Sequence, residues 1–190
     1  MKKALNKYLE LEGVDLVRQW FLDTGIRKEI KKNSYFFREG DAKHYAGFIE
    51  SGSFRYLKSN NKSIQDQIVG YSFDNDFVTD YGAFQMQEKA QVSAQAIKDS
   101  IVWVVSYEKL NHFYDICELK DLRANLSELL LSDIYGRLLS FYVDSPEERY
   151  FKLISRFPEI LNLVSLKEIA SFIKVTPETL SRIRSKMKML

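Results

Sequence analysis

Apolar residues at near-helical spacing lie on both sides of the middle segment of the chain. Over residues 4–22 their period predicts one or two short helices, which Gly25 would end. Over residues 119–142 a sustained apolar stripe, with charged residues on the other faces, predicts one long amphipathic helix. The middle of the chain lacks this period and needs another architecture.

The middle segment, residues 27–107, has the pattern of a β structure. Stretches rich in Phe, Tyr, Val and Ile are separated by turn residues such as Glu39-Gly40-Asp41. Short strands broken by turns every ~8 to 12 residues predict a sandwich or barrel. The aromatic side chains of this segment are expected mainly in its core.

Helix-start signals recur near the C-terminus. Ser145 and Glu148, and later Ser165 and Glu168, have the spacing of capping boxes, in which the Ser and Glu side chains satisfy free amides of the first turn. Pro146 suits the first position of its helix. These signals predict a compact helical domain after the long helix.

Residues 165–187 have the pattern of two short helices joined by a tight turn. Lys174 and Val175 form the turn, Thr176 caps the second helix and Pro177 starts it. The apolar residues expected on the inner sides of both helices are Ile169, Ala170, Ile173, Leu180, Ile183 and Met187. This arrangement predicts a helix-turn-helix.

Charge and polarity on the second of these helices indicate a nucleic-acid partner. Its outer face would present Thr176, Glu178, Thr179, Ser181, Arg182, Ser185 and Lys186. Residues 163–190 hold six Lys or Arg and two Asp or Glu, whereas the whole chain has a net charge of only +2. Such an excess at one end is expected where one domain meets a polyanion. An ordinary solvated helical hairpin is the simpler alternative.

The composition fits a folded protein without a membrane segment. The apolar share is 45% and the charged share 28%, which are ordinary values for a globular chain. No apolar run approaches the ~18 residues of a membrane span, and the first residues lack an export signal, so a cytoplasmic location is expected. Cys117, the single cysteine, is expected to be a buried, inert thiol.

Metal and catalytic sites have little support in the sequence. His44 and His112 are the only histidines and lie far apart. Asp74, Asp76 and Asp80 could gather a divalent cation, although a solvated acidic loop is the simpler interpretation. No phosphate loop or nucleophile elbow occurs, so we expect a protein without metal, cofactor or enzymatic activity.

The order of these features resembles the Crp-Fnr family of bacterial transcription regulators over nearly the whole chain. Residues 176–183 follow the family's recognition element: a Ser or Thr cap, a variable residue, Glu, Thr, an aliphatic residue, a small residue and Arg. By this resemblance Glu178 and Arg182 would read bases, and Thr176 and Thr179 would contact the backbone. Pro177 stands where relatives often have a basic residue, so the sequence preference should differ.

The rest of the chain resembles the same family. Residues 35–41 and 48–55 match early strands of its cyclic-nucleotide-binding jelly roll, and the long helix matches its dimerisation helix. The implied fold is α+β, with an antiparallel β jelly roll at about residues 26–108. The domains would be residues 1–118, the dimerisation helix at 119–144, and the helix-turn-helix domain at 145–190. The expected dimer seam is Leu122, Leu126, Leu130 and Ile134.

Two departures from the family pattern bear on ligand and DNA. Nucleotide-binding relatives hold the cyclic phosphate with a Gly-Glu-rich loop, an Arg and a small hydroxyl residue, but residues 73–84 contain three aspartates and no basic residue. Cyclic AMP is therefore not expected to bind. Phe73, Phe77, Asp80 and Tyr81 are the candidates for a pocket for another effector. Lys174 replaces the usual turn Gly, and the wing that normally follows would be nearly absent.

The resemblance implies a sequence-specific DNA-binding transcription regulator that acts as a homodimer on a palindromic operator. Two-fold symmetry would place the half-sites about 10 base pairs apart. The expected partners are double-stranded DNA, a second copy of the chain, RNA polymerase and a small-molecule effector. Two alternatives remain open at this point: a sensor or protein-interaction module that no longer binds DNA, and a jelly-roll enzyme of the cupin kind.

Overall fold

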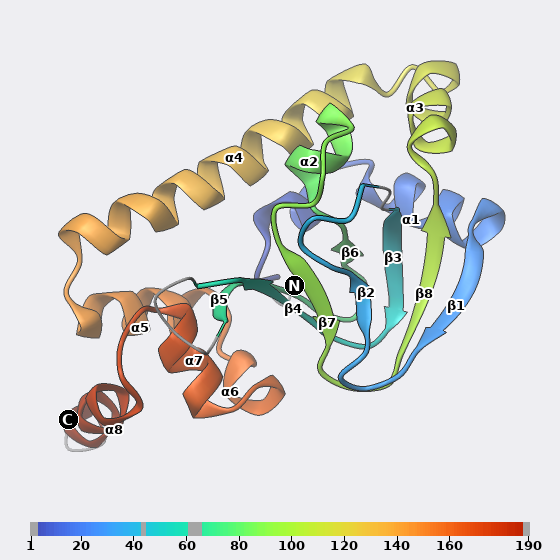
Figure 1. Ribbon diagram of the computed structural model, residues 1–190. Helices are drawn as coiled ribbons and strands as arrows, with labels where there is room; N and C mark the ends of the chain where they lie inside the picture. Colours follow the sequence, from blue (N-terminus) through green and yellow to red (C-terminus); the bar gives the residue numbers. More distant parts are fainter. Residues whose placement is uncertain (1–3, 43–44, 61–65, 188–190) are drawn as a thin grey trace. The chain divides into compact units, whose positions relative to one another are not determined.

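The computed structural model describes residues 4–42, 45–60 and 66–187. The chain forms two compact units (Figure 1). Residues Leu11–Leu126 form the first, here called the jelly-roll unit. The second, the C-terminal unit, combines the described residues up to Glu10 with those from Ser127 onward.

The jelly-roll unit is built on two four-stranded antiparallel sheets, as the sequence predicted. One sheet has the strand order β1 (Ile26–Ile30), β8 (Ser100–Val105), β3 (Ala46–Ser51) and β6 (Phe77–Val78). The other has the order β2 (Tyr35–Phe37), β7 (Ser93–Ala96), β4 (Phe54–Lys58) and β5 (Gln67–Ser72). All neighbouring strands are antiparallel. Consecutive strands alternate between the two sheets except for the hairpin of β4 and β5, and this order gives the jelly-roll topology.

Alternating side chains of the strands fill the space between the two sheets. The core residues are Phe37, Ile49, Phe54, Val78, Ala90, Ala94, Ala96, Val102 and Val104. Small alanines on β7 accompany large rings on β2 and β4, so that the sheets interdigitate. The turn at Glu39-Gly40-Asp41 has the expected geometry, since Gly40 has a φ of 88° and Asp41 Oδ2 accepts a hydrogen bond from the Arg38 amide at 2.8 Å.

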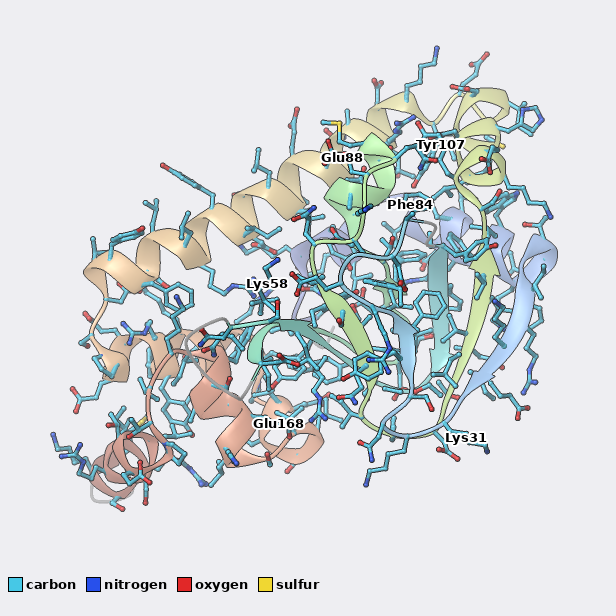
Figure 2. All side chains as sticks on the ribbon, viewed as in Figure 1. Lys31, Lys58, Phe84, Glu88, Tyr107 and Glu168 are labelled. Carbon is cyan, nitrogen blue, oxygen red and sulfur yellow. The ribbon has the colours of Figure 1, made fainter. Side chains whose placement is uncertain are left out.

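Three short helices belong to the jelly-roll unit. Helix α1 (Val14–Thr24) packs against β8 and β3, and α3 (Tyr107–Ile116) follows the last strand. Helix α2 (Tyr81–Met86) was not predicted, because we expected only strands and turns there. Phe84 on α2 meets Tyr107 on α3 edge to face, with ring centroids 5.5 Å apart (Figure 2).

The C-terminal unit is helical, as predicted. It contains the 3-10 turn η1 (Lys7–Glu10) and the helices α5 (Pro146–Arg156), α6 (Ile160–Leu163), α7 (Leu166–Phe172) and α8 (Pro177–Met187). Both expected capping boxes form, one from Ser145 to Glu148 and one from Ser165 to Glu168. Within this unit η1 is fixed by ion pairs from Lys7 to Asp133 at 2.6 Å and from Glu10 to Arg156 at 3.0 Å.

The long helix α4 (Lys120–Val143) lies close to its predicted position and runs from the first unit into the second. Its two halves differ in burial. Leu122 and Leu126, near its start, are only 9% and 7% exposed and are therefore already packed within this chain. Large apolar side chains become exposed farther along the helix, at Leu131, Ile134, Tyr135, Leu138, Leu139, Tyr142 and Val143.

Two sequence-based expectations about single side chains are wrong. Cys117 is exposed, because it caps the end of α3 beyond the last buried turn of that helix. Met187 is 38% exposed, because the inward face of α8 is completed by Leu180 and Ile183. Within the part of the chain that the structure describes, no helix is long and apolar enough to cross a membrane.

Candidate nucleic-acid interface

The residues expected to contact DNA lie on helix α8. An N-terminal cap and buried side chains on its inner face hold this helix in place. The Thr176 hydroxyl oxygen accepts a hydrogen bond from the Thr179 amide at 3.2 Å, so Thr176 caps the helix as predicted. On the inner side Leu180 and Ile183 are buried, and Ala170 on α7 is fully buried. Its small side chain allows close packing, and α8 contacts both α7 and α5.

The outer side of α8 is polar and open to solvent. Thr176, Glu178, Ser181, Arg182, Ser185 and Lys186 are exposed, and Thr179 is half-buried. Glu178 lies three and four residues before Ser181 and Arg182, and these lie four and three residues before Ser185, so the four residues share one helical face. The structure therefore brings the predicted DNA-contacting residues together on one accessible surface.

Hydrogen bonds link several side chains along this surface. Arg182 donates from Nη2 to the Thr179 hydroxyl at 3.3 Å, and the Thr176 and Thr179 hydroxyls are 3.1 Å apart. Hydrogen bonds from its own amide and from the Thr176 hydroxyl, with help from the Arg182 charge, lower the pKa of Glu178. Glu178 therefore stays an ionised acceptor, and Arg182 offers a planar set of donors.

Lys186 has a partner within the protein. Its Nζ lies 3.1 Å from a carboxylate oxygen of Glu147 on α5, and both side chains are largely exposed. An exposed pair of this kind is weak, so a phosphate could displace the carboxylate. The expected phosphate contact at Lys186 would then compete with Glu147.

The turn between α7 and α8 is held by Arg149, which lies on the neighbouring helix α5. Its Nε donates to the Ile173 carbonyl at 2.9 Å, and its Nη1 donates to the Asp144 carbonyl at 2.7 Å. Lys174, in the turn, has a φ of 55°. This is the left-handed backbone that a Gly at the turn would adopt without strain. No periodicity in the sequence could have revealed Arg149.

The four residues expected to line an effector pocket do different things in the jelly-roll unit. Phe77 packs between the rings of Phe21 and Phe48, with centroid distances of 5.4 and 5.8 Å. Phe73 stacks on Tyr71 at 5.7 Å. Tyr81 is the first residue of α2. The rings of Phe73 and Phe77 therefore have packing partners in the chain itself.

Asp80 acts as the N-cap of α2. Its Oδ1 accepts from the Ala83 amide at 3.4 Å and its Oδ2 accepts from the Gln91 amide at 2.7 Å. Its neighbours are also engaged, since Asp76 accepts from the Phe77 amide and Asp74 from Gly52. In the described residues no group of three or more His, Cys, Asp or Glu side chains could hold a metal ion. His44 lies outside the described residues.

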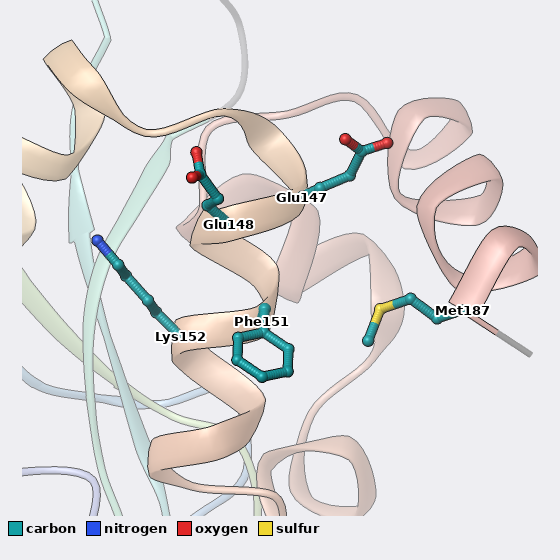
Figure 3. A pocket seen from close by; sticks show the side chains of 5 residues that line it. All are labelled: Glu147, Glu148, Phe151, Lys152 and Met187. Atoms are coloured by element: carbon teal, nitrogen blue, oxygen red, sulfur yellow. The ribbon is translucent and has the colours of Figure 1, made fainter. Parts of the chain in front are cut away.

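A groove of about 290 Å³ lies between α5 and α8 (Figure 3). The Phe151 ring and the Met187 thioether flank it, and Glu147, Glu148 and Lys152 complete the lining. It was not foreseen from the sequence, because Met187 was expected to face inward. The exposed ring of Phe151 and the exposed sulfur of Met187 give the groove an apolar lining beside the polar outer face of α8.

The comparisons with known proteins agree with the fold. Residues 27–117 match the family model of the cyclic nucleotide-binding domain. This stretch contains every strand of the jelly roll from within β1 to β8. No curated protein matches the chain in sequence.

Solved structures of Crp-Fnr regulators are similar in fold over most of the chain. FixK2 from Bradyrhizobium japonicum is 19% identical with a TM-score of 0.74, over 87% of this chain and 85% of that one. CLP from Xanthomonas campestris, a c-di-GMP responsive global regulator, is 18% identical with a TM-score of 0.68, over 94% and 92%. The catabolite activator protein of Thermus thermophilus is 17% identical with a TM-score of 0.58, over 96% and 87%.

Proposed function

We propose that this protein is a transcription regulator of the Crp-Fnr type, whose helix α8 reads the major groove of an operator. The observation that carries the proposal is the outer face of α8. Polar and basic side chains are exposed there on a helix that is capped by Thr176 and packed through Leu180 and Ile183. A helix presented in this way fits the width of the major groove.

The side chains divide naturally between base and backbone contacts. Arg182 can donate two hydrogen bonds to one guanine, and the Glu178 carboxylate can accept from a cytosine amino group. Thr176, Thr179, Ser181 and Lys186 would contact phosphates, which fix the register without reading sequence. Pro177 has no amide proton, so the first turn of α8 contributes one donor fewer.

The exposed half of α4 supports a homodimer. Leu131, Tyr135, Leu138 and Tyr142 are exposed at spacings of four, three and four residues, the pattern of a two-helix seam. Leu122 and Leu126 are buried within the chain itself. We therefore place the seam at Ile134 together with the four exposed residues just named. Two copies paired in this way would present two α8 helices to a palindrome.

Cyclic AMP is not part of the proposal. The first turn of α2 points its amide at Asp80, and the same carboxylate accepts from Gln91. A cyclic phosphate placed there would meet a negative charge that already uses these donors. Regulation would therefore depend on another effector or on none.

A selection experiment tests the proposed function. The purified protein is mixed with a pool of random duplexes at two salt concentrations, with and without cyclic AMP, and bound duplexes are sequenced. We expect a palindrome with half-sites about 10 base pairs apart and the same sequences in both ligand conditions. Weak or unselective binding would instead favour a sensor or protein-interaction module.

A further inference from the structure

The turn between α7 and α8 adopts a backbone that its sequence does not favour. Lys174 has a φ of 55°, in the left-handed region where residues with a side chain are rarely stable. Its amide donates to the Ser171 carbonyl at 3.1 Å, and the Val175 amide donates to the Ala170 carbonyl at 2.9 Å. These bonds end α7, but they leave the outermost carbonyls of the turn without a helical donor.

Arg149 supplies the missing donors. From its place on α5 its guanidinium reaches the carbonyls of Ile173 at 2.9 Å and Lys174 at 3.5 Å. The same group donates to the Asp144 carbonyl, just after α4, at 2.7 Å. One planar cation therefore joins the end of α4, the start of α5 and the turn before α8.

An aromatic ring on α4 adds a second link between these segments. The Phe141 ring lies 4.9 Å from Lys174 Nζ and 5.8 Å from Arg149 Cζ. Both distances allow a cation to interact with the face of the ring. A Gly at position 174 would relieve the strain of the left-handed backbone, but it has no side chain to contact Phe141. The contact with Phe141 therefore accounts for a Lys at this position.

We propose that Arg149, together with Phe141 and Lys174, is a positioning cluster that sets the orientation of the recognition helix relative to the end of α4. The inference rests on the proposed function for its DNA readout. Arg149 touches no DNA in this scheme. It acts by fixing the turn from which α8 starts, so a small change at the end of α4 is transmitted to the base-reading side chains.

The test compares Arg149→Gln with Lys152→Gln as the matched control. Lys152 lies on the same helix and also contacts Asp144, through a side-chain ion pair of 2.7 Å, but it does not reach the turn. Affinity is measured for the selected duplex and for a scrambled one. We expect Arg149→Gln to weaken the selected complex about tenfold, as for loss of one charged hydrogen bond, and the scrambled complex much less.

A double variant separates positioning from general stability. Adding Lys174→Gly to Arg149→Gln removes the strained backbone but also the contact with Phe141, so the specific affinity should stay low if the cluster sets the orientation of α8. Return of the affinity would mean that Arg149 only supports a strained turn. Equal losses on both duplexes, or wild-type affinity in Arg149→Gln, would overturn the inference.

Hydrogen exchange keeps the test independent of DNA. In Arg149→Gln the Lys174 and Val175 amides should exchange faster, while amides in the middle of α8 keep their protection. If the wild-type protein selects no duplex, the proposed function fails. The exchange measurement alone then tests whether Arg149 holds the turn in position. Unchanged protection at the turn would refute it.

Discussion

The jelly-roll unit and the outer face of helix α8 use polar side chains in opposite ways. In the jelly roll, Asp80 caps a helix and Glu39 accepts three hydrogen bonds from Lys58 and Ser59. On α8, by contrast, Arg182 is exposed and donates a hydrogen bond to the Thr179 hydroxyl of the same helix. Charges in the first region maintain the structure, whereas charges in the second remain accessible to a partner.

The largest effect is expected from the exposed half of α4. Leu138 is 46% exposed, and Leu138→Asp would place a charge in the proposed seam, where it would have no partner. We expect sedimentation velocity to show a monomer and specific DNA binding to be lost. Ser132→Asp, at another exposed position of α4, is the control and should remain dimeric. A dimer of Leu138→Asp would exclude this seam.

The second largest effect is a loss of stability when the hydrogen bonds of Asp80 are removed. Asp80→Ala removes a helix cap and the bond to the Gln91 amide, so the free energy of unfolding should fall by about 1–3 kcal/mol. Trp20 and Trp103, both in the jelly-roll unit, report this by fluorescence during urea unfolding. The exposed Asp66 provides the control Asp66→Ala. An unfolding free energy equal to that of the wild-type protein would show that the hydrogen bonds of Asp80 contribute little to stability.

A smaller effect is expected where a surface charge has two possible partners. Lys186→Ala should weaken binding to all duplexes and lower the salt slope of binding by about one unit, because one phosphate contact is lost. Glu147→Gln releases Lys186 and should strengthen binding slightly. Loss confined to the selected duplex would mean that Lys186 reads bases.

The smallest effect is the acid response of Glu39. Hydrogen bonds from Lys58 and Ser59 lower its pKa from 4.5 to about 2. Since the folded pKa is the lower one, the stabilisation is complete above pH 4.5 and disappears as the pH falls towards 2. The stability difference between wild type and Glu39→Gln should shrink over that range, and a constant difference in acid unfolding would refute this role.

Local patterns explain which features could be predicted from the sequence. The caps at Ser145, Ser165 and Thr176, the long helix and the β region all depend on residues close together in the chain, and the structure confirms them. The exposed face of α8 followed from the same kind of spacing. These features required no knowledge of distant contacts.

Contacts between distant residues explain what the sequence could not show. The bonds from Arg149 to the turn join positions 24 or more apart, and nothing in the local pattern marks them. Burial of Leu122 and exposure of Met187 likewise depend on which neighbours fill the space around each helix. Helix α2 was missed because its first turn is stabilised by Asp80, which we had considered for a ligand.

The most direct test of the proposed readout is the specificity ratio of Arg182→Ala, measured by fluorescence anisotropy on the selected duplex and on one changed at single positions. Loss of a bidentate contact to guanine should cost about 1–3 kcal/mol on the selected duplex and relax the preference at one base pair in each half-site. Ser185→Ala on the same face is the control. A ratio equal to that of the wild-type protein would contradict the assignment of α8 as the recognition helix.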